Sequence, residues 1–259
     1  MKMLGDIQSP VYFVSPHYDD AILSAAGLLS YLSKRTKTVL INVFTRATPP
    51  PYSRSVRNML QSLPHTDAIE LFNCRKIEDD QAVNWLSISK YDLDFIDCLY
   101  RRKRLGWLQQ KLFRFIPEMM MIYPVYRLHV IRGKTSPLDN ELIIELKLRL
   151  KEIITEQDAI VFCPSGIGSH VDHFIVRNTC LHSFPSVIMW NDFPYCLSQL
   201  AKDFKNLSVS LFPLAPSVRE EKENLIRMYK SQCRILFPKN VIPIIDEKYF
   251  SLNHTCRKQ

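Results

Sequence analysis

The sequence predicts an α/β fold in which helices cover both faces of a mostly parallel β-sheet, giving three layers. Two observations lead to this prediction. Short runs rich in β-branched and aromatic residues recur along the chain, and most are apolar throughout, as strands buried on both faces are. Segments with apolar residues at helical spacing lie between these runs. The chain of 259 residues is also long enough to bury a core without disulfide or metal support.

Five strands and three helices are expected along the chain. The strands are predicted at residues 11–14, 38–44, 159–163, 187–190 and 207–212. The helices are predicted at residues 20–33, 139–155 and 217–232. Pro137 lies just upstream of the second helix as a start signal. Ser217, followed by the acidic Glu220 and Glu221, is the expected N-cap of the third helix.

We expect one domain that spans residues 1–259, with two segments outside the regular alternation. Residues 47–64, which contain three consecutive prolines, begin as an irregular loop. Residues 91–133 fit the alternation least well and are expected to form a helical or loop insertion. Within them, the basic stretch at residues 101–114 contains no acid. It indicates either a solvated face over the sheet edge or a lip that attracts an anionic substrate or an acidic membrane surface.

Composition and charge exclude several classes of function. The formal net charge of +8 favours an anionic partner, but no nucleic-acid-reading motif accompanies it. Only 6 glycines are present and no glycine-rich phosphate loop, so a nucleotide-dependent transferase is not expected. The 7 cysteines are an odd number without a C-x-x-C pair, which favours the reducing cytoplasm. No apolar run reaches the ~20 residues of a membrane span, so no transmembrane segment is expected.

Polar clusters follow two of the predicted strands, at the edge where open α/β sheets bind their ligands. The first cluster, residues 15–20, contains His17 and ends in two aspartates. The second cluster, residues 164–173, ends in His170, Val171, Asp172 and His173. A helical pattern follows each cluster. The sequence therefore predicts two strand–loop–helix turns that carry metal-ligand side chains.

The residue types and their spacing predict a catalytic metal site. His17 and Asp20 are three residues apart at a helix start, so both side chains can reach one point. A histidine of the second cluster would complete three ligands and leave a position for water, as in catalytic zinc sites. Asp19 lies beside this site as a candidate general base. One of His170 and His173 would bind the metal, while the other, when protonated, would stabilise an oxyanion.

Two further residues are candidates for supporting roles. Asp172 could accept a hydrogen bond from the ring nitrogen of a metal-binding histidine that faces away from the metal, and so orient that imidazole. Arg46 follows the second predicted strand and could hold a substrate hydroxyl or anion, although a surface arginine is the competing interpretation. A set of two histidines and one aspartate does not distinguish zinc from iron(II), so Fe²⁺ is the alternative metal.

The two clusters resemble the signatures of the PIG-L/LmbE-like deacetylases. Residues 16–20 are similar to the P-H-x-D-D motif of that family, and residues 170–173 to its H-x-D-H motif. The resemblance implies a Rossmann-like sheet and zinc-dependent hydrolysis of N-acyl groups, typically acetyl groups on glucosamine-containing conjugates. The implied zinc ligands are His17, Asp20 and His173. Asp19 is implied as general base, and His170 as the acid and electrostatic stabiliser.

Three weaker elements extend the resemblance over most of the chain. Residues 75–82 are similar to an R-x-x-E-x-x-x-A helix, and residues 190–195 to a Y-x-D-x-P-Y element with tryptophan in place of the first tyrosine. Residues 221–232 are similar to the C-terminal helix of the family. Arg75 and Asp192 belong to these elements and are candidates for supporting the metal site or binding substrate.

The expected function is hydrolysis of an amide in an amino-sugar-containing glycoconjugate or specialised metabolite. Tyr18 and Ala21 stand where the commonest family motif has proline and glutamate, a form that resembles a branch associated with such metabolites. Two alternatives stay open. The basic stretch favours a deacylase of a lipid-linked or anionic sugar, with peripheral membrane contact. The fold alone would also serve a non-catalytic sugar-binding protein. The sequence does not indicate an oligomeric state.

Overall fold

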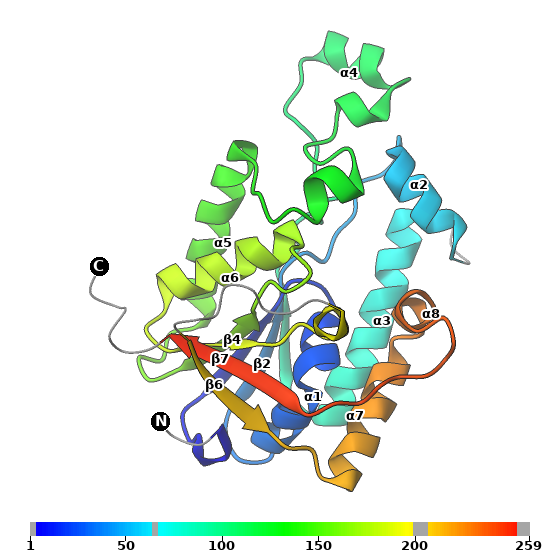
Figure 1. Ribbon diagram of the computed structural model, residues 1–259. Coiled ribbons are helices and arrows are strands. Elements are labelled where there is room, and N and C mark those ends of the chain that lie inside the picture. Colours follow the sequence, from blue (N-terminus) through cyan, green and yellow to red (C-terminus); the bar gives the residue numbers. More distant parts are fainter. Residues whose placement is uncertain (1–3, 64–66, 199–206, 253–259) are drawn as a thin grey trace.

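The described residues form one sheet of seven strands, with β1 near its centre (Figure 1). The computed structural model describes residues 4–63, 67–198 and 207–252. Across the sheet the order is β3 (Ser89–Asp92), β2 (Thr38–Asn42), β1 (Val11–Ser15), β4 (Ile160–Pro164), β5 (Val187–Trp190), β7 (Glu247–Leu252) and β6 (Leu207–Phe212). The first five are parallel, whereas β7 runs antiparallel to both β5 and β6.

Helices cover both faces of this sheet (Figure 1). They are α1 (Asp20–Ser33), α2 (Arg54–Gln61), α3 (Ala68–Leu86), α4 (Trp107–Phe113), α5 (Asn140–Ile153), α6 (Val171–Ser183), α7 (Pro216–Met228) and α8 (Lys230–Leu236). Short 3₁₀ helices occur at Leu4–Asp6, Pro117–Met119, Pro137–Asp139 and Tyr195–Leu197, and a π-helical turn at Tyr126–Val130. α1 and α3 both pack on α7, while α5 packs on α6. Among the described residues, no helix is long and apolar enough to cross a membrane.

The three-layer α/β class predicted from the sequence is confirmed, and all five expected strands are present. The sequence prediction misses β3 and β7. β3 has the sequence Ser-Lys-Tyr-Asp and lies at the sheet edge, where its residues are half-buried or exposed. It therefore lacks the apolar run that marks the buried strands. β7 begins with a glutamate and a lysine, which hide its strand character in the same way.

The predicted helix at residues 217–232 is wrong in two respects. It is divided at Tyr229 into α7 and α8. The Tyr229 ring is fully buried and its hydroxyl donates to Asp79 Oδ1 at 2.8 Å, so the chain turns there to place the ring in the core. The helix also begins earlier than expected. Ala215 is the N-cap and Pro216 the first helical residue, because proline is favoured at that position, so Ser217 caps nothing.

The sheet order explains why the two polar clusters meet. β1 and β4 are neighbouring parallel strands, paired from Val11–Ile160 to Phe13–Phe162. The Phe13 and Phe162 rings stack with centroids 4.6 Å apart, which fixes the contact between the strands. Parallel neighbours end at the same edge of a sheet, so the loops that follow β1 and β4 lie side by side.

The two irregular segments lie at that same end of the molecule (Figure 1). Residues 47–64 begin as the expected loop and then form α2. Residues 91–133 begin inside β3 and then contribute α4, a 3₁₀ helix and the π-helical turn, with no further strand of the sheet. This second segment projects away from the sheet, with α4 at its far end (Figure 1).

Candidate active site

Three side chains predicted as zinc ligands converge beyond the ends of β1 and β4. His17 Nδ1 lies 2.9 Å from Asp20 Oδ2, and His173 Nε2 lies 3.3 Å from the same oxygen. One ligand atom from each residue lies within 4.8 Å of the others. Two imidazoles and one carboxylate form the donor set of a catalytic zinc site. These side chains therefore fit the ion.

Local structure brings the three side chains together. β1 ends at Ser15, whose hydroxyl donates to the His17 carbonyl at 2.6 Å and accepts from the Ala21 amide at 3.1 Å. This tight turn leads directly into α1, which begins at Asp20. α6 begins at Val171, within the second cluster, and carries His173 in its first turn. Both turns have the strand–loop–helix form expected from the sequence.

Each of the two histidines has a carboxylate beside its other ring nitrogen. His173 Nδ1 lies 2.9 Å from Asp192 Oδ1. His17 Nε2 lies 3.4 Å from Asp172 Oδ2 and 3.5 Å from Asp97 Oδ2. Such partners fix the tautomer and orientation of a metal-binding imidazole. Asp192 and Asp172 are both predicted from the sequence, whereas Asp97 follows the unpredicted strand β3 and belongs to no motif.

The charges of the site favour a bound cation. Burial opposes protonation of His17 and His173, but Asp20 and the other carboxylates outweigh it and raise the pKa of both imidazoles, that of His173 to about 10. Burial also opposes ionisation of Asp20, yet the two histidines hold its pKa well below the usual range. A divalent cation would take the place of these protons among the carboxylates.

Asp19 is buried beside the ligands, at the start of α1. It occupies the N-cap position without a side-chain capping hydrogen bond, so capping does not account for its carboxylate. Burial and then the charge of Asp20 raise the pKa of Asp19 to about 6, while Arg75 and His17 oppose the shift. A carboxylate with a pKa near neutrality is suited to accept a proton and to release it again.

His170 is the N-cap of α6 and lies against both histidines predicted as ligands. Its ring centroid is 5.1 Å from that of His17 and 5.3 Å from that of His173. The Asp172 amide donates to His170 Nδ1 at 3.3 Å, so the neutral ring carries its proton on Nε2. Burial and then the charge of His17 lower the pKa of His170 to about 3. The geometry therefore supports a neutral donor, in place of the protonated imidazole expected from the sequence.

Arg101 corrects the interpretation of the basic stretch at residues 101–114. Its side chain is only 5% exposed and pairs with Asp172, and its Nη1 lies 3.3 Å from Asp139. The solvated face or lip predicted from the sequence therefore begins after this residue. Burial would raise the pKa of the fully buried Asp172, but Arg101 outweighs it and holds that pKa well below the usual range. Arg101 thus keeps a charged carboxylate available beside His17.

The PIG-L family model, described as GlcNAc-PI de-N-acetylase, matches residues 12–184. The matched region covers most of the chain and includes both motifs. The chain belongs to the PIG-L family. This membership confirms the family and the N-deacetylase class of enzyme predicted from the sequence, and zinc as the cofactor agrees with it. No curated protein matches the chain in sequence.

Solved structures share the fold of this PIG-L protein at low sequence identity. The zinc-inhibited form of teicoplanin deacetylase Orf2 has a TM-score of 0.72 at 22% identity, covering 93% of this chain and 97% of that chain. The A40926 pseudoaglycone deacetylase Dbv21 has a TM-score of 0.68 at 23% identity, with coverages of 95% and 98%. The N,N'-diacetylchitobiose deacetylase from Pyrococcus horikoshii has a TM-score of 0.52 at 14% identity, with coverages of 96% and 84%.

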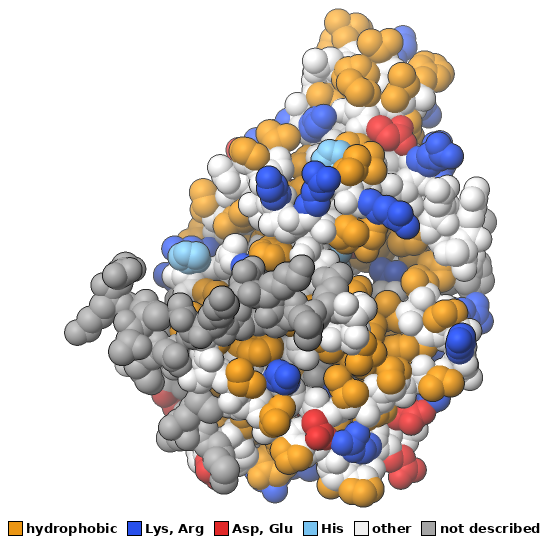
Figure 2. Space-filling model, viewed as in Figure 1, with side chains coloured by type: hydrophobic (Ala, Val, Ile, Leu, Met, Phe, Trp, Pro, Cys, Tyr) orange, Lys and Arg blue, Asp and Glu red, His pale blue; other side chains and the backbone are white. Residues whose placement is uncertain are grey.

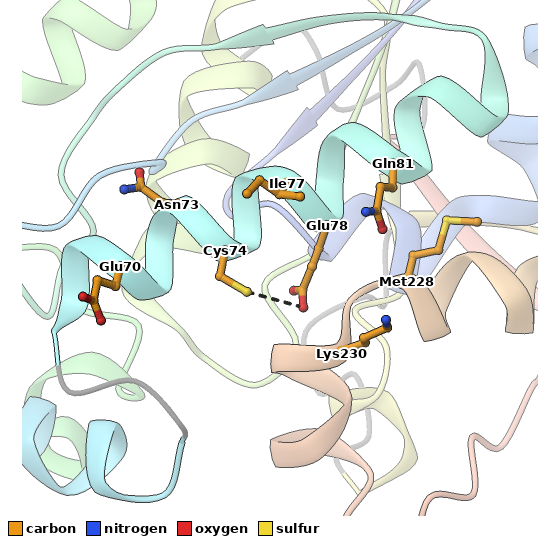
Figure 3. Close-up of a pocket in the computed structure, with 8 residues that line it drawn as sticks. All are labelled: Glu70, Asn73, Cys74, Ile77, Glu78, Gln81, Met228 and Lys230. Atoms are coloured by element: carbon orange, nitrogen blue, oxygen red, sulfur yellow. Dashed lines mark hydrogen bonds between the residues drawn. The ribbon is translucent and has the colours of Figure 1, made fainter.

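The weaker elements of the PIG-L resemblance contact one another. Glu78 on α3 accepts hydrogen bonds from the Ser231 amide at 2.9 Å and the Ser231 hydroxyl at 2.6 Å. Arg75 lies 3.3 Å from Gln232 Oε1. Figure 3 shows Glu78 directed from α3 toward the helix that carries Lys230, beside a cavity of about 470 Å³. α3 and the C-terminal helices are thereby held together behind the site, and the residues that line this cavity include none of the metal ligands.

Arg46 lies apart from the ligand cluster of this PIG-L protein. It is exposed and lines a surface cavity of about 550 Å³ with Tyr18, Lys76 and Asp92 among others. Lys76 Nζ lies 2.6 Å from Asp92 Oδ2 within this cavity. The structure thus does not bring Arg46 to the metal ligands, and its role in substrate binding stays a prediction.

Proposed function

We propose that this N-deacetylase removes an acetyl group from an amino-sugar-containing substrate, using zinc held by His17, Asp20 and His173. The observation that carries the proposal is the convergence of these ligand atoms within 4.8 Å, beside the buried Asp19. Zinc there would supply Lewis acidity, which polarises the amide carbonyl and promotes ionisation of water. Iron(II) is the alternative metal, because the donor set does not discriminate between the two.

Asp19 accepts the proton of the attacking water. The water oxygen bonds to the carbonyl carbon, and the proton is held on the Asp19 carboxyl group. When the carbon–nitrogen bond breaks, the same carboxyl group returns its proton to the leaving nitrogen. The products are acetic acid and a free amine, which become acetate and an ammonium group when the acid proton passes to the amine, so atoms and charge balance. The pKa of about 6 at Asp19 suits both transfers near neutral pH.

His170 stabilises the negative charge that develops on the carbonyl oxygen. Its Nδ1 is engaged by the Asp172 amide, which leaves Nε2–H, 3.9 Å from Cys98 Sγ, as the donor of a ring that lies against His17. A neutral donor fixed before the reaction begins stabilises an oxyanion without any reorganisation. This role replaces the acid function that the resemblance implied for His170, since Asp19 already supplies the proton to the amine.

The substrate class rests on the named relatives and on the charge of the chain. The structural neighbours are named as deacetylases of teicoplanin, of the A40926 pseudoaglycone and of N,N'-diacetylchitobiose. They support a small glycoconjugate substrate. The exposed lysines and arginines of residues 102–134 favour, as a second candidate, an anionic or lipid-linked amino sugar.

We place the enzyme in a reducing, cytoplasmic compartment, which is supported by the free cysteines 74, 98, 163, 180, 196 and 233.

Metal content and acetate release together test the proposal. The assay tries N,N'-diacetylchitobiose and GlcNAc-phosphatidylinositol as candidate substrates. Asp19→Asn should keep about one zinc per chain and lose roughly 10²–10⁴-fold in kcat, since it removes only the proton acceptor. His173→Ala should lose both zinc and activity. The exposed Asp158→Asn is the control and should match the wild type.

Two outcomes would contradict the proposal. Near-normal turnover by Asp19→Asn would remove Asp19 from its role as base. A wild-type protein that binds these sugars and holds zinc, yet releases no acetate from any of them, would favour the non-catalytic sugar-binding protein.

A further inference from the structure

The segment that projects beyond the sheet, residues 102–134, carries an unusual amount of exposed apolar surface. No residue of α4 is buried. Trp107, Leu112 and Phe115 have exposed fractions of 72%, 68% and 87%. Figure 2 shows hydrophobic side chains gathered at the top of this projection, with Lys and Arg side chains below and around them. Contiguous apolar surface of this kind marks a site of interaction with a protein or a membrane.

The same segment holds almost all of the excess positive charge of the chain. Residues 102–134 contain eight lysines and arginines and a single acid, Glu118. Their net charge is +7, compared with +8 for the whole protein. Six of the eight basic residues are exposed, and the other two are half-buried. Apolar and cationic side chains are therefore combined on one projection, while the charges of the remaining chain nearly cancel.

The segment stands beside the active site. Arg101, the residue directly before the segment, forms an ion pair with Asp172, and Asp172 lies beside His17. Further along, the Tyr126 ring lies 6.4 Å from the ring of His170. The base of the segment therefore lies beside the ligand cluster, while α4 lies at its far end (Figure 1).

We propose that residues 102–134 dock the enzyme on an anionic lipid bilayer, with Trp107, Leu112 and Phe115 inserted at the level of the headgroups. Lysine and arginine side chains near such a surface are attracted by its negative charge, and tryptophan and phenylalanine favour this interface. Charge complementarity selects an anionic membrane. An anionic polymer such as a nucleic acid would use the cations but would leave the aliphatic and aromatic side chains in water. The proposal does not depend on catalysis.

Vesicle sedimentation tests the docking. Vesicles of phosphatidylcholine with phosphatidylglycerol should bind the protein at least tenfold more tightly than vesicles of phosphatidylcholine alone, with weakening at high salt. The triple serine variant, Trp107→Ser with Leu112→Ser and Phe115→Ser, should weaken binding at least tenfold. The matched control is Ile77→Ser with Trp85→Ser and Val241→Ser, which changes exposed apolar residues outside the segment. It should bind as the wild type does.

Reversing the charge of basic residues in the segment separates the electrostatic contribution to vesicle binding from the apolar one. Lys111→Glu with Arg114→Glu should weaken binding at least tenfold, whereas Arg149→Glu with Lys151→Glu on the exposed face of α5 should change it less than threefold. Asp19→Asn should bind vesicles normally, so a failure of docking and a failure of the catalytic proposal can be told apart.

Trp107 also reports insertion directly. Its emission should shift to the blue when anionic vesicles are added, and Trp107→Phe should abolish this shift while keeping sedimentation. Binding that persists unchanged in the triple serine variant would reduce the interaction to surface adsorption and overturn the proposal. Absence of vesicle binding, with dimerisation that the same variant abolishes, would assign the surface to a second copy of the chain instead.

Discussion

His173 Nδ1 and Asp192 Oδ1 lie 2.9 Å apart, with both side chains buried. The same aspartate accepts from the Ser165 hydroxyl at 2.6 Å and from the Ile167 amide at 2.9 Å. One carboxylate therefore orients the imidazole and holds the loop that follows β4. The opposite ring nitrogen of His173 is left facing Asp20, as a metal ligand requires.

Asp192→Asn should weaken zinc binding by about 10- to 100-fold, because the neutral amide no longer supports the basicity of the His173 ring. The fold should persist, since asparagine keeps an oxygen and the side-chain volume. Competition with a chromogenic chelator measures the zinc affinity, and circular dichroism checks the fold. Asp158→Asn, on an exposed residue, should leave the affinity unchanged. Equal zinc affinity in both variants would remove the supporting role from Asp192.

The convergence of His17, Asp20 and His173 could be predicted because each motif places these side chains within one turn of a helix start. His17 and Asp20 share the turn after β1, and only the sheet order was needed to bring His173 to them. Asp97 could not be predicted, because it follows a strand whose polar sequence hides it. Arg101 was misread for a different reason. A run of basic residues resembles a solvated face, and nothing local reveals that its first member reaches the buried Asp172.

Arg101→Met should cost roughly 3–5 kcal/mol of unfolding free energy, because it leaves the buried Asp172 without its cationic partner. Arg104→Met is the matched control from the same basic stretch. Its side chain is 88% exposed and pairs with Glu141, which is 73% exposed, so its loss should cost less than about 1 kcal/mol. Urea unfolding of the two variants measures the difference. Similar losses in both would show that the charge of Asp172 does not depend on Arg101.

Asp79 should make the stability of the protein depend on pH. It is fully buried on α3, where Lys90 Nζ lies 2.9 Å and the Tyr229 hydroxyl 2.8 Å from its carboxylate oxygens. Burial raises its pKa to about 6, although Lys90 and Tyr229 oppose the shift and the nearby Asp92 adds to it. In the unfolded chain the pKa returns to about 3.9.

The sign follows from which state holds the proton. Between about pH 4 and pH 6 only the folded state keeps Asp79 protonated, so its contribution to the unfolding free energy falls as the pH rises through this window. Over the whole window the fall is on the order of 2–3 kcal/mol. Asp79→Asn cannot titrate, so its stability relative to the wild type should rise by that amount between about pH 4 and pH 7.

Urea unfolding at several pH values across this range measures the effect. Asp80→Asn is the control, because Asp80 is the next residue, pairs with the same Lys90 and has a side chain that is 44% exposed. Since the Asp80 carboxylate is partly exposed to water, Asp80→Asn should change the unfolding free energy by less than about 1 kcal/mol. Parallel pH profiles for Asp79→Asn and the wild type would show that the buried carboxyl group is ionised throughout, with Lys90 compensating its charge in full.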